Sequence, residues 1–242
     1  MDLKELRRSW DAFGKLDPLW AILRAPGKKG RRWESAEFFA TGQQEISGVM
    51  ERVDRLPMRP RRGVALDFGC GVGRVTQALA SYFDEVVGVD IAPSMVRLAE
   101  QYNRHGGKCR YVVNDREDLG LFPDSAFDFV YSNITLQHME PRYALGYIRE
   151  FLRVLGPGGV AVFQLPSEPL PWLMPFIGLA SAVLGWYCRV ANGPRMEVFG
   201  IRRGEVTAFL LANGGKVLDI RRHDAVKGWR GYDYSVAKDP GG

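Results

Sequence analysis

From residue 64 onward, short continuous apolar runs alternate with segments in which apolar residues recur at helical spacing. This pattern extends over most of the chain. Short apolar runs at residues 64–68, 85–90, 109–114, 127–133 and 159–165 predict buried strands. Between them, apolar positions recur at helical spacing after residue 74, after Pro93 and after Pro141, and proline suits the first turn of a helix. A helix at residues 205–212 and strands at 216–222 and 232–237 follow. Strands alternating with helices predict an α/β fold around a mostly parallel sheet.

Residues 1–60 stand outside this alternation and predict only helices. One amphipathic helix is marked by Leu3, Leu6, Trp10 and Phe13. A second carries apolar positions between residues 42 and 56 and ends at Pro57. We expect these helices to cap the site at the ends of the strands. The alternative is that they cover an edge of the sheet.

The first predicted strand runs directly into a glycine-rich turn, Asp67-Phe-Gly-Cys-Gly-Val-Gly73. Glycine permits positive φ and lets a ligand lie against bare backbone, so this strand-to-helix junction predicts a nucleoside cofactor. The second strand ends at Asp90, whose carboxylate is placed to accept hydrogen bonds from ribose hydroxyls. The nicotinamide fingerprint requires a third glycine at position 74, where this chain has Arg74.

Four further motifs follow the turn in order: Val89-Asp90-Ile-Ala-Pro-Ser-Met95, Asn114-Asp115, Phe127-Asp-Phe-Val-Tyr-Ser-Asn133 and Leu155-Gly-Pro-Gly-Gly159. Together the five resemble the class I S-adenosylmethionine-dependent methyltransferases, over roughly residues 60–165. The resemblance implies a Rossmann-like, doubly wound sheet of seven strands, mostly parallel with an antiparallel last strand. We expect an N-terminal helical cap at residues 1–60 and a cofactor-binding methyltransferase domain at 61–242, with a lid insertion at about 167–200.

The resemblance and the chemistry of the side chains together imply how the cofactor is held at its methionine end and ribose. Gly69 and Gly71 let the methionine part lie against the backbone, and Asp67 meets its ammonium group. The backbone of Asn133 faces the same ammonium group, and Asp90 holds the ribose.

The adenine ring is expected to pack against Ile91 and to donate its amino group to Asp115. The predicted cofactor-binding set is Asp67, Gly69, Cys70, Gly71, Gly73, Arg74, Asp90, Ile91, Met95, Asp115, Arg116 and Asn133. These contacts require no metal, and the sequence has no carboxylate and histidine cluster with ligand spacing.

His138 is the candidate general base. Methyl transfer depends mainly on alignment, but an oxygen or nitrogen acceptor that must lose a proton benefits from a base of near-neutral pKa. His138 lies just after the fourth strand, in Leu136-Gln-His-Met139, and resembles a histidine that many family members carry there. A structural role is the alternative.

Twenty uncharged residues run from Pro169 to Cys188. Pro175 leaves an uninterrupted helix of only about 20 Å, too short for a hydrocarbon core of about 30 Å, so we predict no membrane span. We expect an apolar lid that contacts the acceptor or rests on a membrane surface; ordinary packing against the cap helices is the alternative. The predicted lid residues are Trp172, Met174, Phe176, Trp186 and Tyr187.

Net charge and cysteine content limit the kinds of partner and the cellular compartment that we expect. The formal net charge is +5, and residues 24–32 hold five cations and no acid. Such a loop is either simply solvated or meets an anionic substrate or membrane surface. No nucleic-acid module is recognisable, so no nucleic-acid partner is expected. Three separated cysteines and a start without a secretory pattern favour no disulfide, no zinc site and a cytoplasmic location.

The predicted function is transfer of the methyl group of S-adenosylmethionine to an oxygen or nitrogen of a small apolar or amphiphilic metabolite. Two alternatives stay open, a nicotinamide-dependent oxidoreductase and a non-catalytic S-adenosylmethionine-binding protein. The sequence leaves the acceptor, the methylated atom and the oligomeric state undetermined.

Overall fold

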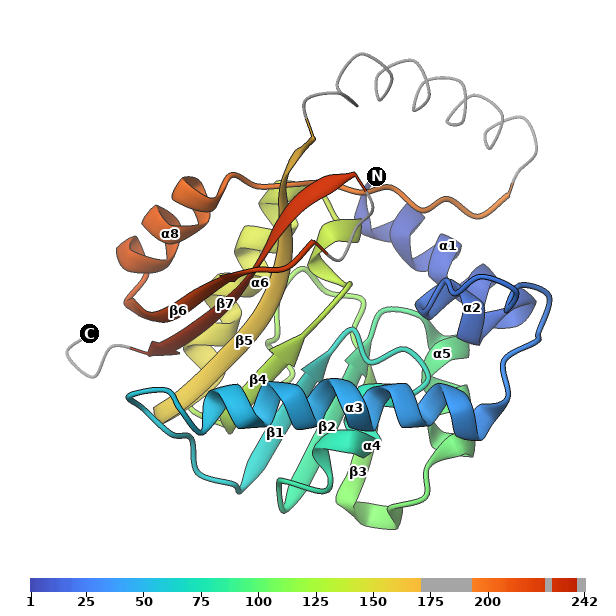
Figure 1. The fold of residues 1–242 in the computed structure, drawn as a ribbon, viewed down its shortest axis with the longest axis horizontal. Helices are drawn as coiled ribbons and strands as arrows, with labels where there is room; N and C mark the ends of the chain where they lie inside the picture. Colours follow the sequence, from blue (N-terminus) through green and yellow to red (C-terminus); the bar gives the residue numbers. More distant parts are fainter. Residues whose placement is uncertain (171–192, 225–227, 239–242) are drawn as a thin grey trace.

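A seven-stranded sheet forms the centre of the molecule (Figure 1). The computed structural model describes residues 1–170, 193–224 and 228–238. The strands are β1 (Val64–Phe68), β2 (Glu85–Asp90), β3 (Cys109–Val113), β4 (Phe127–Ser132), β5 (Leu155–Pro169), β6 (Gly215–Arg222) and β7 (Trp229–Lys238). Their order in the sheet is β3-β2-β1-β4-β5-β7-β6. Strands β1 to β5 pair in parallel, whereas β7 is antiparallel to both β5 and β6, which confirms the predicted fold.

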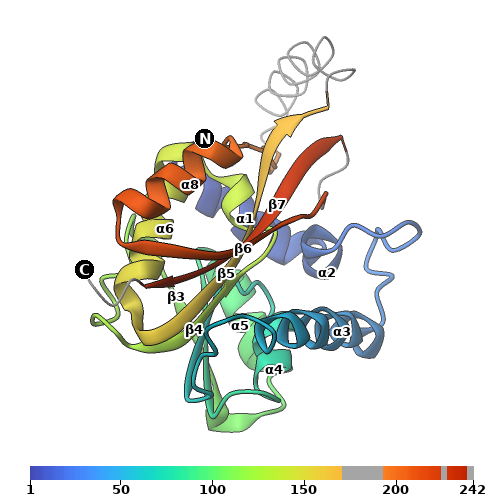
Figure 2. The same cartoon turned by 60° about the vertical axis from the view of Figure 1, so that its left-hand side comes forward.

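Helices cover both faces of the sheet. The described helices are α1 (Leu3–Leu16), α2 (Pro18–Ile22), α3 (Ser35–Val53), α4 (Arg74–Leu79), α5 (Pro93–Tyr102), α6 (Pro141–Val154) and α8 (Arg203–Ala212), with short 3-10 turns η1 (Gly106–Lys108) and η2 (Leu136–His138). Figure 2 shows α6 and α8 on one side of the strands and α3 and α4 on the other. Proline begins α5 and α6, as their sequences predicted.

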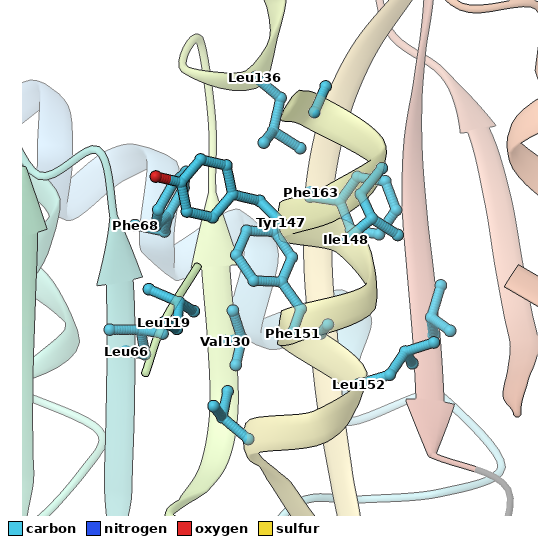
Figure 3. Close-up of a cluster of buried hydrophobic side chains, with 14 of the residues drawn as sticks. Leu66, Phe68, Leu119, Val130, Leu136, Tyr147, Ile148, Phe151, Leu152 and Phe163 are labelled. Carbon is cyan, nitrogen blue, oxygen red and sulfur yellow. The ribbon is translucent and has the colours of Figure 1, made fainter. Parts of the chain in front are cut away.

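The face under α6 holds the larger hydrophobic cluster (Figure 3). Tyr147 and Phe151 of α6 lie against Phe68 at the end of β1, with ring centroids 4.5 Å and 5.2 Å apart. These residues are buried, and each fully buried aromatic side chain contributes about 1.5–3 kcal/mol by the hydrophobic effect. This packing fixes the carboxyl ends of β1 and β4 relative to α6.

The opposite face is covered by α3 and α4. Ile46 and Met50 of α3 share a buried cluster with Phe129 of β4 and Val160 of β5. Helix α3 therefore lies across a face of the sheet. The sequence analysis expected it either to cap the ends of the strands or to cover an edge of the sheet. Residues 1–60 contribute to the same clusters as the sheet; their treatment as a separate unit stays a prediction.

Two further features differ from the sequence prediction. The short helix α2 was not anticipated, because five residues are too few to display a helical period. Strand β5 continues to Pro169, beyond the predicted end at residue 165, because β7 pairs with it as far as Trp229. None of the described helices is both long and apolar enough to cross a bilayer.

Candidate functional site

A cavity of about 940 Å³, solvent at its mouth included, lies at the carboxyl ends of the parallel strands. Open α/β sheets bind ligands at this edge, where neighbouring connections diverge to opposite faces. Most of the cavity lining comes from the glycine turn after β1, the ends of β2 and β4, the segment after β4, and the N-terminal helices. The apolar wall supplied by α1, α2 and the segment after β4 is formed by Leu3, Leu6, Trp10, Ile22, Ile134 and Met139.

The glycine turn adopts the backbone that its sequence predicted. Gly69, Gly71 and Gly73 have φ of 80°, 53° and 81°, in the left-handed region that other residues rarely adopt. A Cβ at Gly69 would collide with the Thr135 side chain. The amide of Gly69 donates to the Val89 carbonyl at 2.7 Å, which holds the turn against the end of β2. Bare backbone is thereby presented to the cavity.

Asp90 joins the turn to the end of β2. One of its carboxylate oxygens accepts from the Gly71 amide at 2.9 Å, and the other accepts from the Ala92 amide at 2.8 Å. Burial raises the pKa of Asp90, and these backbone hydrogen bonds oppose that rise. Each oxygen keeps a further lone pair, and both Asp90 and Ile91 line the cavity. The carboxylate is therefore available to two hydroxyl donors.

Asp67 is a buried carboxyl group in the floor of the cavity. The Thr76 hydroxyl donates to it at 2.6 Å. Burial raises the pKa of Asp67 to about 7, while Thr76 and Arg74 act to lower it. The site therefore holds a carboxyl group poised to ionise near neutral pH, and a cationic ligand would favour the ionised form.

A further carboxylate, Glu45, approaches from α3 with its side chain 22% exposed, and it was not anticipated. It accepts from Arg74 Nη2 at 2.7 Å, from the Tyr131 hydroxyl at 2.8 Å and from Asn133 Nδ2 at 2.9 Å. Burial acts to raise the pKa of Glu45, but Arg74 and these hydrogen bonds lower it below the ordinary value. The only sequence signal was that residue 45 lies next to Ile46, beside the buried stripe of α3.

Arg74 and Asn133 each keep one polar atom without a partner among the described residues. Arg74 Nε and Asn133 Oδ1 are buried and form no hydrogen bond. Both residues line the cavity. A buried donor or acceptor left unpaired costs about 1–3 kcal/mol, so such atoms point to a ligand or ordered water.

His138 lines the cavity but is engaged within the protein. Its Nδ1 donates to the Glu197 carbonyl at 2.8 Å, and its Nε2 lies 3.2 Å from Gln137 Nε2, which requires Nε2 to accept. Trp10 packs edge-on against the imidazole, with centroids 5.2 Å apart. Burial, aided by the charge of Arg24, lowers the pKa of His138 to about 4 against the opposing effect of the Glu197 bond. The neutral ring is thus held by both nitrogens.

The lowered pKa of His138 predicts a loss of stability in acid. The unfolded chain binds a proton at about pH 6.5 and the folded chain only at about pH 4, so stability falls as the pH drops between these values. From pH 7 to pH 5 this single group costs about 2 kcal/mol of unfolding free energy. Urea denaturation should show that His138→Gln loses correspondingly less stability over this interval. Equal losses in both proteins would contradict the low pKa.

At the predicted adenine end of the site, the structure places Asn114, and not the expected Asp115, in the cavity lining. Asn114 lines the cavity and donates from Nδ2 to the Asp118 carbonyl at 2.8 Å. Asp115 points away to an exposed ion pair with Arg7 at 2.5 Å, and Arg116 pairs with Asp118 at 2.9 Å. The sequence of the motif Asn114-Asp115 does not indicate which of the two side chains points into the cavity.

Four predicted residues do not line the cavity: Gly73, Met95, Asp115 and Arg116. Gly73 and Met95 support it from behind. A Cβ at Gly73 would lie 2.6 Å from the Tyr111 hydroxyl, and Met95 is fully buried beneath the N-terminal helices with Leu19 and Phe38. The remaining predicted cofactor residues all reach the cavity: Asp67, Gly69, Cys70, Gly71, Arg74, Asp90, Ile91 and Asn133.

The predicted lid residues Trp172, Met174, Phe176, Trp186 and Tyr187 lie outside the described residues. Within the described ranges, no group of three or more histidine, cysteine or acidic side chains is arranged to hold a metal ion. Cys70 and Cys109 are buried free thiols.

Comparisons with known proteins agree with this geometry. A family described as a methyltransferase domain matches residues 66–163. The chain is 35% identical over 141 residues to phosphoethanolamine N-methyltransferase 3 of Arabidopsis thaliana, a match covering 55% of the chain and 27% of that protein. It is 31% identical over 128 residues to 2-methyl-6-phytyl-1,4-hydroquinone methyltransferase of Synechocystis, covering 52% of the chain and 39% of that protein. These matches thus span well under half of the length of either relative.

The fold is also similar to a solved structure over almost its whole length. Magnesium protoporphyrin IX methyltransferase from Synechocystis, solved with bound S-adenosylhomocysteine, superposes with a TM-score of 0.64 at 18% identity, covering 98% of this chain and 100% of that one. The matched motifs, the sheet order and the glycine turn favour S-adenosylmethionine over the nicotinamide alternative. Residues 66–163 of the chain form a domain of the methyltransferase family, and the fold is that of S-adenosylmethionine-dependent methyltransferases.

Proposed function

We propose that the chain transfers the methyl group of S-adenosylmethionine to an oxygen or nitrogen of a small apolar or amphiphilic metabolite. The observation that carries this proposal is the composition of the cavity, whose lining combines apolar side chains from α1 and α2 with the carboxylates and the glycine turn. Ligand sites of this kind are mostly apolar, with a few polar groups that fix orientation.

The residues present fit the cofactor. Asp90 would accept from the ribose hydroxyls, Ile91 would pack on the adenine, and the Gly69 and Gly71 backbone would lie along the methionine part. Asp67 would face the ammonium group. The unpartnered Arg74 Nε and Asn133 Oδ1 form a buried donor and acceptor pair, as the carboxylate and ammonium groups of an amino acid require.

The protein's contribution to the reaction is mainly alignment. When bound, S-adenosylmethionine supplies an electrophilic methyl group, so the protein must hold an acceptor lone pair in line with it. The apolar wall orients the acceptor and excludes water. His138 can act as the base only if the hydrogen bond from Gln137 to its Nε2 breaks. While that bond is present, the low pKa of His138 favours a structural role.

The relatives' names describe different acceptors, among them phosphoethanolamine, a phytyl hydroquinone and a malonyl group on acyl-carrier protein. The acceptor of this chain is therefore argued from its own cavity. Peripheral contact with a membrane surface and a cytoplasmic location stay predictions, supported by the basic loop at residues 24–32 and by the buried free thiols.

A transfer assay with methyl-labelled S-adenosylmethionine tests this function. Three acceptor probes cover the chemical range: an alkylated hydroquinone, decanoate and phosphoethanolamine. We expect label to reach an apolar or amphiphilic probe and not phosphoethanolamine. Transfer to phosphoethanolamine alone would contradict the proposed acceptor class. Binding of the cofactor without transfer to any probe would favour the non-catalytic alternative.

A further inference from the structure

We propose that Glu45 is a positioning residue for the amino-acid end of the cofactor, a role that rests on the proposed binding of S-adenosylmethionine. Glu45 lies on α3, outside the residues 66–163 that match the family. It does not line the cavity, so it acts through the residues that do.

The two oxygens of Glu45 organise three side chains from α4 and from the end of β4. Arg74 begins α4, Tyr131 is in β4, and Asn133 follows β4. Oε2 accepts from Arg74, and Oε1 accepts from both Tyr131 and Asn133. One carboxylate thus fixes three donors that would otherwise rotate independently.

The orientation of Asn133 depends directly on this carboxylate. Because Nδ2 donates to Glu45, the amide must turn Oδ1 the other way, where it has no partner among the described residues. The Asn133 carbonyl already accepts from the Thr135 hydroxyl at 3.1 Å. The side-chain oxygen is therefore an acceptor without a partner among the described residues, and the Asn133 carbonyl keeps one further lone pair, so both could accept from an ammonium group.

Arg74 is oriented in the same way. Its Nη2 is held by Glu45 and its Nη1 by Thr41 Oγ1 at 3.3 Å, which leaves Nε as the donor without a partner. Glu45 also balances the charge of a nearly fully buried guanidinium. A donor and an acceptor fixed in this way match a zwitterion, with Arg74 Nε donating to its carboxylate and Asn133 Oδ1 accepting from its ammonium group.

Gly42 explains how Glu45 reaches the site. A Cβ at Gly42 would collide with the Arg74 carbonyl, so only glycine permits α3 to approach α4 this closely. Ile46, directly after Glu45, and Met50, more than one turn further on, then anchor α3 on the sheet face. The N-terminal segment thereby contributes a charge to the cofactor site as well as a cover.

Calorimetric titration of Glu45→Gln with two ligands tests the proposal. S-Adenosylhomocysteine carries the amino-acid end, whereas 5′-methylthioadenosine shares the adenosine and thioether but lacks it. We expect the variant to bind S-adenosylhomocysteine at least tenfold more weakly and 5′-methylthioadenosine within twofold of wild type. Glu51→Gln, an exposed position on the same helix, should change neither affinity.

Equal weakening of both ligands, or no change in either, would overturn the proposal. We expect Asn133→Ala to give the same selective loss without removing a charge, so it serves if Glu45→Gln does not fold. Equal effects of Asn133→Ala on the two ligands would also overturn it. If wild-type protein binds neither ligand, the failure lies with the proposed function and not with Glu45.

Discussion

Asp90→Ala should lower the affinity for S-adenosylhomocysteine at least tenfold, and by about a hundredfold if both ribose contacts are lost. Each charge-assisted hydrogen bond contributes about 1.5–3 kcal/mol, and the Asp90 carboxylate is placed to accept two. The substitution also releases the Gly71 and Ala92 amides, which the carboxylate holds at 2.9 Å and 2.8 Å. Part of the loss will therefore come from a less ordered glycine turn. Calorimetric titration measures the change directly.

Glu85→Ala is the matched control for Asp90→Ala. It removes an exposed carboxylate from the start of the same strand and should leave the affinity unchanged. Asp90→Asn retains one acceptor oxygen, so its affinity should fall between those of wild type and Asp90→Ala. A folded Asp90→Ala protein with wild-type affinity would show that the ribose is held elsewhere.

Asp67→Asn should make the ligand-free protein more stable at alkaline pH and weaken cofactor binding. The pKa of Asp67 is raised to about 7 by burial, so the folded chain holds a proton that the unfolded chain releases at about pH 4. Stability therefore falls as the pH rises from 4 to 7. Between pH 5 and pH 8 this one group costs about 2 to 3 kcal/mol, which the amide avoids. Urea denaturation at the two pH values measures the difference.

The same carboxyl group should make cofactor binding depend on pH. If the ligand ammonium group requires ionised Asp67, the affinity of wild-type protein rises about tenfold from pH 6 to pH 8, and Asp67→Asn removes this rise. Asp84→Asn, at an exposed turn, should retain the wild-type pH dependence. Parallel pH profiles for wild type and Asp67→Asn would mean that Asp67 does not titrate in this range.

The strands of the sheet could be predicted because each strand carries its own signal. Buried parallel strands are continuous apolar runs, and the turns between them are marked by glycine or proline, as at Gly69 and Pro141. The extent of β5 could not be predicted in the same way, because residues 166–169 are ordered by pairing with β7. Such pairing between distant segments has no local pattern.

The site residues likewise fall into two groups, those that a local motif predicts and those that contacts between distant segments position. The glycine turn and Asp90 lie within motifs whose spacing identifies them. Glu45 comes from a helix with no motif, and its only sequence signal was its position beside the buried stripe of that helix. Likewise, Asn114 lines the cavity while Asp115 pairs with Arg7 of α1 outside it, which the sequence of the motif does not indicate. Contacts made by the N-terminal helices thus account for features of the site that the motifs do not predict.

Calorimetric titration of the wild-type protein with S-adenosylmethionine and, separately, with NAD⁺ tests the central claim most directly. The cavity and its carboxylates predict saturable binding of S-adenosylmethionine at one site per chain and no measurable binding of NAD⁺. Saturable binding of NAD⁺, or no binding of S-adenosylmethionine by the folded protein, would contradict the assignment of this site.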